Sequence, residues 1–193
     1  GVVIGLVALG IATRGLSFMN VGPFGGLLKE YQKNRLASFI YPDRDPSGSG
    51  YNVLQSTIAV GSGGITGKGL GFGSQSQLNF LPVVHSDFIF AAIAEAWGLV
   101  GSYGFISLFL LLIYRLVVAA RIAHDEYGSA ICIGLAAMLL FELLVSVGMN
   151  IKVMPVTGIP LPFVSYGGTA MLTFFFAMGV AQSVVIRSKR LTF

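Results

Sequence analysis

A carboxylate stands directly before a long apolar segment of this chain. His85, Ser86 and Asp87 precede an apolar run that begins at Phe88. Aspartate is favoured at the N-cap of a helix, where its charge complements the helix dipole. The same carboxylate could serve as a general base or a metal ligand if it reaches the proton that it removes. Both roles are compatible. His85 could be a second acid or base, or a loop histidine with ordinary hydrogen bonds.

Three further ionisable residues fall inside apolar segments: Arg14, Glu95 and Glu142. Glu95 lies eight residues after Asp87, which on a continuous helix is about 12 Å deeper and on a neighbouring face. Ionisable groups inside a membrane are costly and tend to face a cavity or a partner. We therefore expect either a functional role or, for Arg14 and Glu142 above all, a structural pair.

The glycine-rich segment 61–73, GSGGITGKGLGFG, contains one cation, Lys68. It matches neither the P-loop pattern, because Ser62 and Gly69 stand at two of the defining positions, nor the dinucleotide fingerprint, so nucleotide binding is rejected. Two interpretations remain. The segment is a flexible, turn-rich loop, or its backbone N–H groups form an anion site to which Lys68 adds charge.

A proline-rich segment, MPVTGIPLPFVSYGG at 154–168, separates two apolar runs. Pro155, Pro160 and Pro162 exclude a regular helix. At membrane depth, irregular backbone is tolerated only where protein or a water-filled cavity satisfies its polar groups. The segment is therefore either a wall of a substrate cavity or a rigid connector.

The composition places these residues in a membrane protein. Of 193 residues, 54% are hydrophobic and 10% are charged, against about 25% charged in a soluble domain. Apolar runs at about 1–19, 88–120, 129–151 and 169–186 reach, or nearly reach, the length of about 20 residues that spans a bilayer. The sequence predicts an all-α polytopic membrane protein, with one membrane domain over 1–193 and four spans. The single cysteine, Cys132, excludes an internal disulfide.

Basic residues predict the orientation of these spans. Arg115 and Arg121 lie between the second and third runs, and the fourth run is followed by Arg187, Lys189 and Arg190. This side and the C-terminus are therefore predicted to be cytoplasmic, and the long loop at about 20–87 to be extracellular. Within that loop, segment 27–40 is expected to form an interfacial helix. The modest net charge of +4 gives little support for nucleic-acid binding. Because the chain opens without Met inside an apolar run, we expect it to be cut from a longer protein.

Four stretches together resemble the SEDS family (shape, elongation, division and sporulation). They are DRDPSGSGYNVLQS at 43–56, IAVGSGGITGKG at 58–69, SQSQLNFLPVVHSDFIFAAIAEAWGLVG at 74–101 and GIPLPFVSYGG at 158–168. Their detailed forms are more similar to the elongation branch, RodA, than to the division branch. The resemblance implies a bundle of about ten transmembrane helices, of which this chain would supply the last four.

The resemblance also implies an activity and its setting. The family polymerises lipid II into glycan strands at the outer face of the bacterial cytoplasmic membrane, as an inverting glycosyltransferase with undecaprenyl diphosphate as leaving group. Its essential aspartate falls on Asp87 in the motif HSDFIF. Expected partners are lipid II, the nascent glycan, a class B penicillin-binding protein and other elongation-complex proteins. The sequence departs from the family pattern at Val83-Val84, Ala96 and Lys152.

We accordingly predict that Asp87 is catalytic, as the base for the acceptor hydroxyl or as the ligand of a divalent cation, Mg or Mn. No tightly bound cofactor is expected. Substrate contacts are predicted for Lys68, Arg44, His85, Glu95 and Ser165, with the first two stabilising the diphosphate. Two alternatives remain: a lipid II flippase, in which Glu95 and Glu142 would matter more than Asp87, and a non-catalytic scaffold of the cell-wall synthesis complex.

Overall fold

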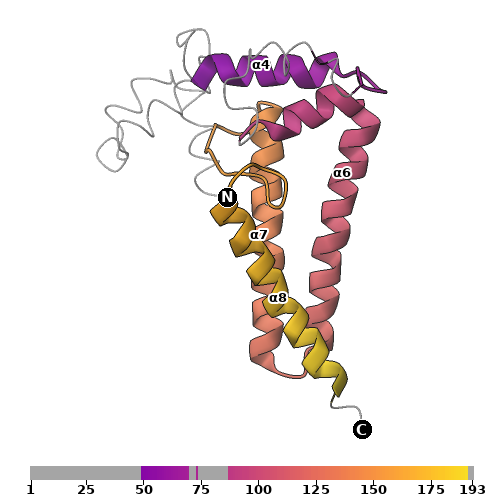
Figure 1. The fold of residues 1–193 in the computed structure, drawn as a ribbon, viewed down its shortest axis with the longest axis vertical. Coiled ribbons are helices and arrows are strands. Elements are labelled where there is room, and N and C mark those ends of the chain that lie inside the picture. The colour runs from indigo at the N-terminus through magenta and orange to yellow at the C-terminus, as the bar shows by residue number, and fades with distance from the viewer. Residues whose placement is uncertain (1–48, 70–72, 74–86, 191–193) are drawn as a thin grey trace, which may run out of the picture. The chain divides into compact units, whose positions relative to one another are not determined.

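The computed structural model describes residues 49–69, 73 and 87–190. The chain divides into two compact units, Gly1–Tyr51 and Asn52–Phe193, and the account below concerns the second. Its helices are α4 (Ser49–Ser62), α6 (Ile89–Ile122), α7 (Glu126–Asn150) and α8 (Gly168–Arg190) (Figure 1). The described part contains no strand, which confirms the all-α class. The predicted first span at 1–19 and the predicted interfacial helix at 27–40 lie outside the described residues.

Three of the helices, α6, α7 and α8, are long and apolar enough to cross a membrane. Their outward faces carry large apolar side chains: Leu108, Leu111, Phe141, Leu144, Leu172, Phe175 and Phe176 are all exposed. Only 11% of the apolar stretch of α8 is buried within the chain. Helices that are hydrophobic all round suit a lipid environment rather than water, so these three helices support the polytopic membrane class.

The core between α6, α7 and α8 combines aromatic side chains with small ones. Buried residues from the three helices form one cluster, including Phe109, Ile113, Leu116, Cys132, Ala136, Leu139, Phe174 and Ala181. Small residues let membrane helices approach closely. Gly128 of α7 is one example, because a Cβ at that position would lie 2.9 Å from Cγ1 of Val184 in α8. A short turn joins α6 to the antiparallel α7 (Figure 1).

Helix α6 breaks at Gly98, whose backbone angles are φ 67° and ψ −161°. This region is open essentially to glycine alone. Residues 89–97 run across the direction that residues 99–122 then follow beside α7 (Figure 1). The part that follows the other spans is therefore 99–122, about 36 Å long at 1.5 Å per residue. Glu95 belongs to the part that runs across this direction, so its separation from Asp87 along the helix is not a separation along the spans (Figure 1).

The glycine-rich segment fills this break with backbone hydrogen bonds. An unbroken helix would pair the N–H of Leu99 with the carbonyl of Glu95, and that of Val100 with the carbonyl of Ala96. Here the N–H groups of Leu99 and Val100 donate instead to the carbonyls of Gly64 (2.9 Å) and Ile65 (3.2 Å). The carbonyls of Glu95 and Ala96 accept from the N–H groups of Lys68 (3.0 Å) and Gly69 (2.9 Å). All four groups that the break frees are satisfied.

Glycine is required for this contact because the two backbones nearly touch. A Cβ on Gly63 would overlap the carbonyl oxygen of Ala94, and one on Gly67, which has φ 80°, would overlap that of Ala96. The expectation of a turn-rich segment is confirmed at residues 63–66. These residues are bonded to α6, and the N–H groups of Lys68 and Gly69 donate within the chain rather than to an anion.

Helix α7 ends in a Schellman motif centred on Lys152. The N–H of Val153 donates to the carbonyl of Gly148 (2.8 Å), and the N–H of Lys152 donates to that of Met149 (3.4 Å). Lys152 has φ 60°, the left-handed conformation that this motif usually assigns to glycine. The residues that follow, 151–167, contain no helix, as the three prolines predict.

Replacing Gly98 with alanine should destabilise the chain strongly. The glycine-only conformation costs other residues about 1–3 kcal/mol, and the new Cβ would also overlap the backbone nitrogen of Gly67. Gly104→Ala in the same helix is the matched control, because a Cβ there meets open space and alanine favours a helix interior by roughly 0.5–1 kcal/mol. Thermal unfolding in detergent should show a lower midpoint for Gly98→Ala only. Equal midpoints would mean that the break is not required.

Candidate functional site

Asp87 does not cap helix α6. The N-cap residue is Phe88, and no side chain of the cap residue bonds to the helix, so the predicted capping role of Asp87 is wrong by one position. The Asp87 side chain is half-buried. Within the described part of the chain, its carboxylate takes part in no hydrogen bond or ion pair. The carboxylate is therefore not used to hold these residues together, and it remains available for chemistry.

The side chain of Asn150, at the C-terminus of α7, holds the start of α6 instead. Its Oδ1 accepts a hydrogen bond from the N–H of Ala91 (3.2 Å). Its Nδ2 donates to the backbone carbonyls of Ser146 (2.7 Å) and Asp87 (3.4 Å). Asn150 is fully buried, where unsatisfied amide groups would be costly. One amide therefore caps a helix that begins far from it in the sequence and fixes the backbone of the candidate catalytic residue.

Helix α4 joins the same point through Ser56. The Ser56 hydroxyl lies 3.2 Å from the carbonyl oxygen of Asn150 and 3.0 Å from that of Val53, so it is placed to donate to either. Ala59 of α4 packs beside it against Phe88 and Ala91. Sequence reasoning missed α4 altogether. Its signal was a row of small or apolar residues three or four apart, at Val53, Ser56, Ala59 and Gly63, which is the spacing of one helix face.

Lys68 and Glu95, both predicted as substrate contacts, meet in an ion pair. Lys68 Nζ lies 3.3 Å from Glu95 Oε1, and the Ser62 hydroxyl lies 3.4 Å from the same oxygen. The Glu95 side chain is 0% exposed and that of Lys68 is 32% exposed. A buried charge without a partner is strongly destabilising. The first role of Lys68 is therefore to balance Glu95, beside the segment that the glycine-rich residues hold.

Ser165 is used within the proline-rich segment. Its buried hydroxyl accepts a hydrogen bond from the N–H of Leu161 (2.7 Å), and its N–H donates to the carbonyl of Leu161 (3.0 Å). The intervening Phe163 has φ 62°. These bonds close a tight turn that inserts Leu161 into the core. The remaining predicted contacts, Arg44 and His85, lie outside the described residues, as does Arg14.

A polar stripe runs along α7 at helical spacing, through Glu142, Ser146 and Asn150. Glu142 Oε2 and Ser146 Oγ are buried and, in the described residues, have no hydrogen-bond partner. The structural pair expected for Glu142 is therefore absent from this part of the chain. No group of three or more His, Cys, Asp or Glu side chains that could hold a metal occurs among residues 49–69, 73 and 87–190. The described residues thus offer no multidentate site for a divalent cation at Asp87.

Comparison with known proteins identifies relatives of the whole chain. The family model FTSW_RODA_SPOVE, described as cell cycle protein, matches residues 2–190. Peptidoglycan glycosyltransferase MrdB of Escherichia coli (strain K12) is 44% identical over 167 residues, 86% of this chain and 45% of MrdB. Peptidoglycan glycosyltransferase RodA of Treponema pallidum (strain Nichols) is 42% identical over 161 residues, 83% of this chain and 37% of that protein. The chain spans less than half the length of these relatives.

A solved structure has the same fold. It is described as "Structural coordination of polymerization and crosslinking by a peptidoglycan synthase complex". One of its chains matches 96% of this chain over 48% of its own length, with a TM-score of 0.66 and 30% sequence identity.

Removing the Asn150 amide should unlock the start of α6. In Asn150→Leu, the shape is roughly retained but the amide hydrogen bonds are lost, and leaving buried polar groups unpaired costs about 1–3 kcal/mol each. Ser146→Ala, one turn away and equally buried, is the control, because its hydroxyl has no partner in the described residues. Thermal unfolding midpoints should fall for Asn150→Leu and stay near wild type for Ser146→Ala. Equal shifts in the two midpoints would show that the stability depends on buried polar groups in general and not on the interhelical amide.

Proposed function

We propose, since this chain belongs to the FtsW, RodA and SpoVE family of cell cycle proteins, that it forms part of a peptidoglycan glycosyltransferase whose substrate is lipid II. The observation that carries the proposal is Asp87. Its carboxylate takes part in no bond within the described residues, while its backbone is fixed by Asn150. A reactive group on a held backbone is the arrangement that catalysis by positioning needs.

The proposed reaction is an inverting glycosyl transfer. Asp87 removes the proton from the acceptor sugar hydroxyl as a general base. The acceptor oxygen attacks the anomeric carbon of the donor, and the bond from that carbon to the undecaprenyl diphosphate oxygen breaks with inversion. The leaving diphosphate carries the electron pair and requires electrostatic stabilisation. Each step conserves atoms and charge without an additional reactant.

Electrostatic stabilisation of the negatively charged leaving diphosphate is assigned to Lys68 and Arg44. Lys68 pairs with Glu95 but keeps about a third of its side chain exposed, so the same ammonium can approach a bound phosphate. His85, Glu95 and Ser165 are proposed as further contacts that shape the sugar site, with Glu95 acting through Lys68. A divalent cation, Mg or Mn, is proposed only as a ligand brought with the diphosphate, and no step here depends on it.

The proposed setting is the outer face of the bacterial cytoplasmic membrane. Asp87 lies at the opposite end of α6 from Arg115 and Arg121, and the positive-inside rule assigns those residues to the cytoplasm together with the C-terminus. An elongation role is proposed because MrdB and RodA are among the similar proteins. The synthase complex in which the structural relative occurs supports a class B penicillin-binding protein as partner. Nascent glycan and other elongation-complex proteins complete the proposed assembly.

A second candidate function is supported by Glu142. A carboxylate oxygen buried inside a membrane span without a partner in the described residues is expected in transporters, where ionisable groups line a pathway. A lipid II flippase would therefore depend on Glu142 more than on Asp87. A scaffold without chemistry of its own would depend on neither.

Asp87→Asn should abolish polymerisation while leaving the fold intact. Loss of a general base lowers rates by about 10²–10⁴-fold, and the backbone carbonyl that Asn150 holds is unchanged. Asp125→Asn is the control, because it makes the same chemical change before α7 at the other end of the spans. The measurement is glycan polymer formed from purified lipid II by the full-length protein with its partner, per unit of folded protein. Near wild-type polymerisation by Asp87→Asn would exclude the carboxylate as base. Transport of lipid II across vesicles that Glu142→Gln abolishes and Asp87→Asn does not would favour the flippase.

Lys68 and Glu95 can be tested as a pair. Lys68→Met alone should cost about 1–3 kcal/mol, less than the 3–5 kcal/mol for a wholly buried pair because Lys68 is partly exposed. Lys68→Met combined with Glu95→Gln should recover most of that stability, since no buried charge is then left unpaired. If Lys68 also stabilises the diphosphate, the double variant should still lose about 10²-fold in polymerisation rate. Recovery of both stability and rate would restrict the pair to a structural role.

A further inference from the structure

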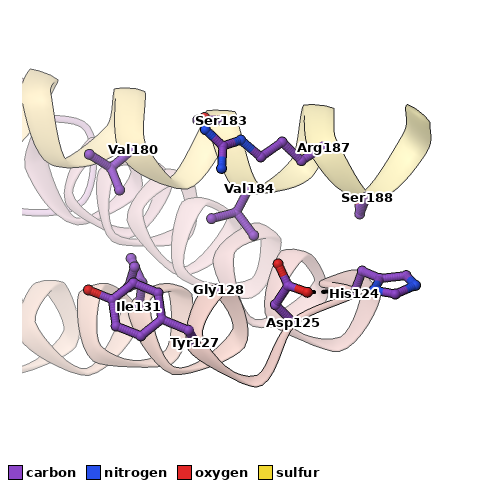
Figure 2. A pocket seen from close by; sticks show the side chains of 10 residues that line it. All are labelled: His124, Asp125, Tyr127, Gly128, Ile131, Val180, Ser183, Val184, Arg187 and Ser188. Atoms are coloured by element: carbon purple, nitrogen blue, oxygen red, sulfur yellow. Dashed lines mark ion pairs between the residues drawn. The ribbon is translucent and has the colours of Figure 1, made fainter. Parts of the chain in front are cut away.

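A pocket opens at the end of the spans opposite Asp87. It has a volume of about 250 Å³ and lies between the N-terminal part of α7 and the C-terminal part of α8 (Figure 2). Its apolar lining consists of Ile131, Val180, Val184 and the ring of Tyr127. Its polar lining consists of His124, Asp125, Ser183, Arg187 and Ser188. The pocket is therefore amphipathic.

The two kinds of lining are ordered along the helices. On α8, Val180 precedes Ser183, and Arg187 and Ser188 follow at the end of the apolar stretch, Gly168–Ser188. On α7, Ile131 lies about one turn inside the span, while His124 and Asp125 precede its start at Glu126. The apolar part consequently points toward the membrane interior, and the polar part lies where the spans end, at headgroup level.

The charge of Arg187 is not balanced within the described residues. Asp125 is the acidic residue of the pocket, and its Oδ1 lies 3.6 Å from His124 Nδ1 (Figure 2). No ion pair to Arg187 occurs in the part of the chain that the structure describes. Near these helix ends, the sequence contains three further basic residues, Arg121, Lys189 and Arg190, and two acidic residues, Asp125 and Glu126. The Ser188 hydroxyl already donates to the carbonyl of Val185 (2.8 Å). The pocket therefore offers a guanidinium and one hydroxyl donor, from Ser183, to an anion.

We propose that this pocket binds an anionic phospholipid of the cytoplasmic leaflet. The phosphate would be held by Arg187, whose planar guanidinium suits bidentate phosphate contacts, with the Ser183 hydroxyl as a further donor. An acyl chain would lie along Ile131 and Val180. Basic pockets between membrane helices on the cytoplasmic side are suited to acidic headgroups. The proposal uses the orientation given above but does not depend on glycosyl transfer.

A lipid fits these features better than a soluble anion. A free phosphate would use Arg187 and the Ser183 hydroxyl but would leave the apolar side of the pocket without an occupant. An apolar helix of a partner would fill that side but would bury the unbalanced guanidinium, which is costly without a carboxylate. Only a molecule with an anionic head and an apolar tail satisfies both parts of the lining.

The test is lipid retention by the full-length protein after mild delipidation, followed by mass spectrometry, with phosphatidylglycerol and phosphatidylcholine offered together. Wild type should retain phosphatidylglycerol preferentially. Arg187→Gln should reduce that preference about tenfold, as expected for loss of about 1.4 kcal/mol. Ser183→Trp, which fills the pocket from an exposed position, should reduce retention of both lipids. The controls are Arg121→Gln, an exposed cation of the same end outside the pocket, and Gln182→Trp, an exposed neighbour outside it.

The proposal is overturned if wild type retains both lipids equally, or if Arg187→Gln and Arg121→Gln weaken retention alike, because general surface charge would then explain it. It is also overturned if inorganic phosphate displaces phosphatidylglycerol, since the site would then take the free anion. Only variants that elute as folded protein are compared. For these, the rise in melting temperature on adding phosphatidylglycerol gives a second readout, which Arg187→Gln should lose and Arg121→Gln should keep.

Discussion

A break in a membrane helix must be satisfied by protein, because lipid supplies no hydrogen-bond donors or acceptors. Helix α6 breaks at Gly98, and the two carbonyls and two N–H groups that it frees are all paired with residues 64–69. This pairing explains the glycine-rich composition, since the backbones come too close for side chains at Gly63 and Gly67. It also fixes the direction of residues 89–97, which directly follow Asp87 and the N-cap residue Phe88.

Helix α7 also helps to position the backbone of Asp87. The buried amide of Asn150 accepts from the N–H of Ala91 and donates toward the carbonyl of Asp87, and the Asn150 carbonyl is within reach of the Ser56 hydroxyl of α4. Three helices are thus joined at one residue. Because these contacts use the backbone of Asp87 and not its carboxylate, the structure holds the residue while its carboxylate makes no bond within the described residues. The ion pair of Lys68 with Glu95 stabilises the other end of the same segment.

The two ends of the spans differ in how their polar side chains are used. At the Asp87 end, the side chains of Ser56 and Asn150 join α4, α6 and α7, while the Asp87 carboxylate makes no hydrogen bond within the described residues. At the opposite end, α7 and α8 separate enough to leave an amphipathic pocket, and a guanidinium is left over. Between them, small residues such as Cys132 and Ala136 pack in the core. In the described part of the chain, one end of the spans thus carries a carboxylate outside the hydrogen-bond network, and the other end carries an amphipathic pocket.

The sequence alone determined the membrane class, the all-α fold and the family. It could do so because the length of an apolar run, the effect of proline on a helix and the residue pattern of a motif are local properties of the chain. It also predicted Asp87 as a catalytic residue and Lys68 and Glu95 as substrate contacts. What it did not reveal were helix α4, the break at Gly98, the ion pair between Lys68 and Glu95 and the role of Asn150. Each of these joins residues tens of positions apart, such as Asn150 with Ala91 and Ser56. A glycine or an asparagine in a sequence does not state which distant backbone group it will meet. Only the tertiary structure decides that, because it brings those groups together where water is excluded and each must find a partner.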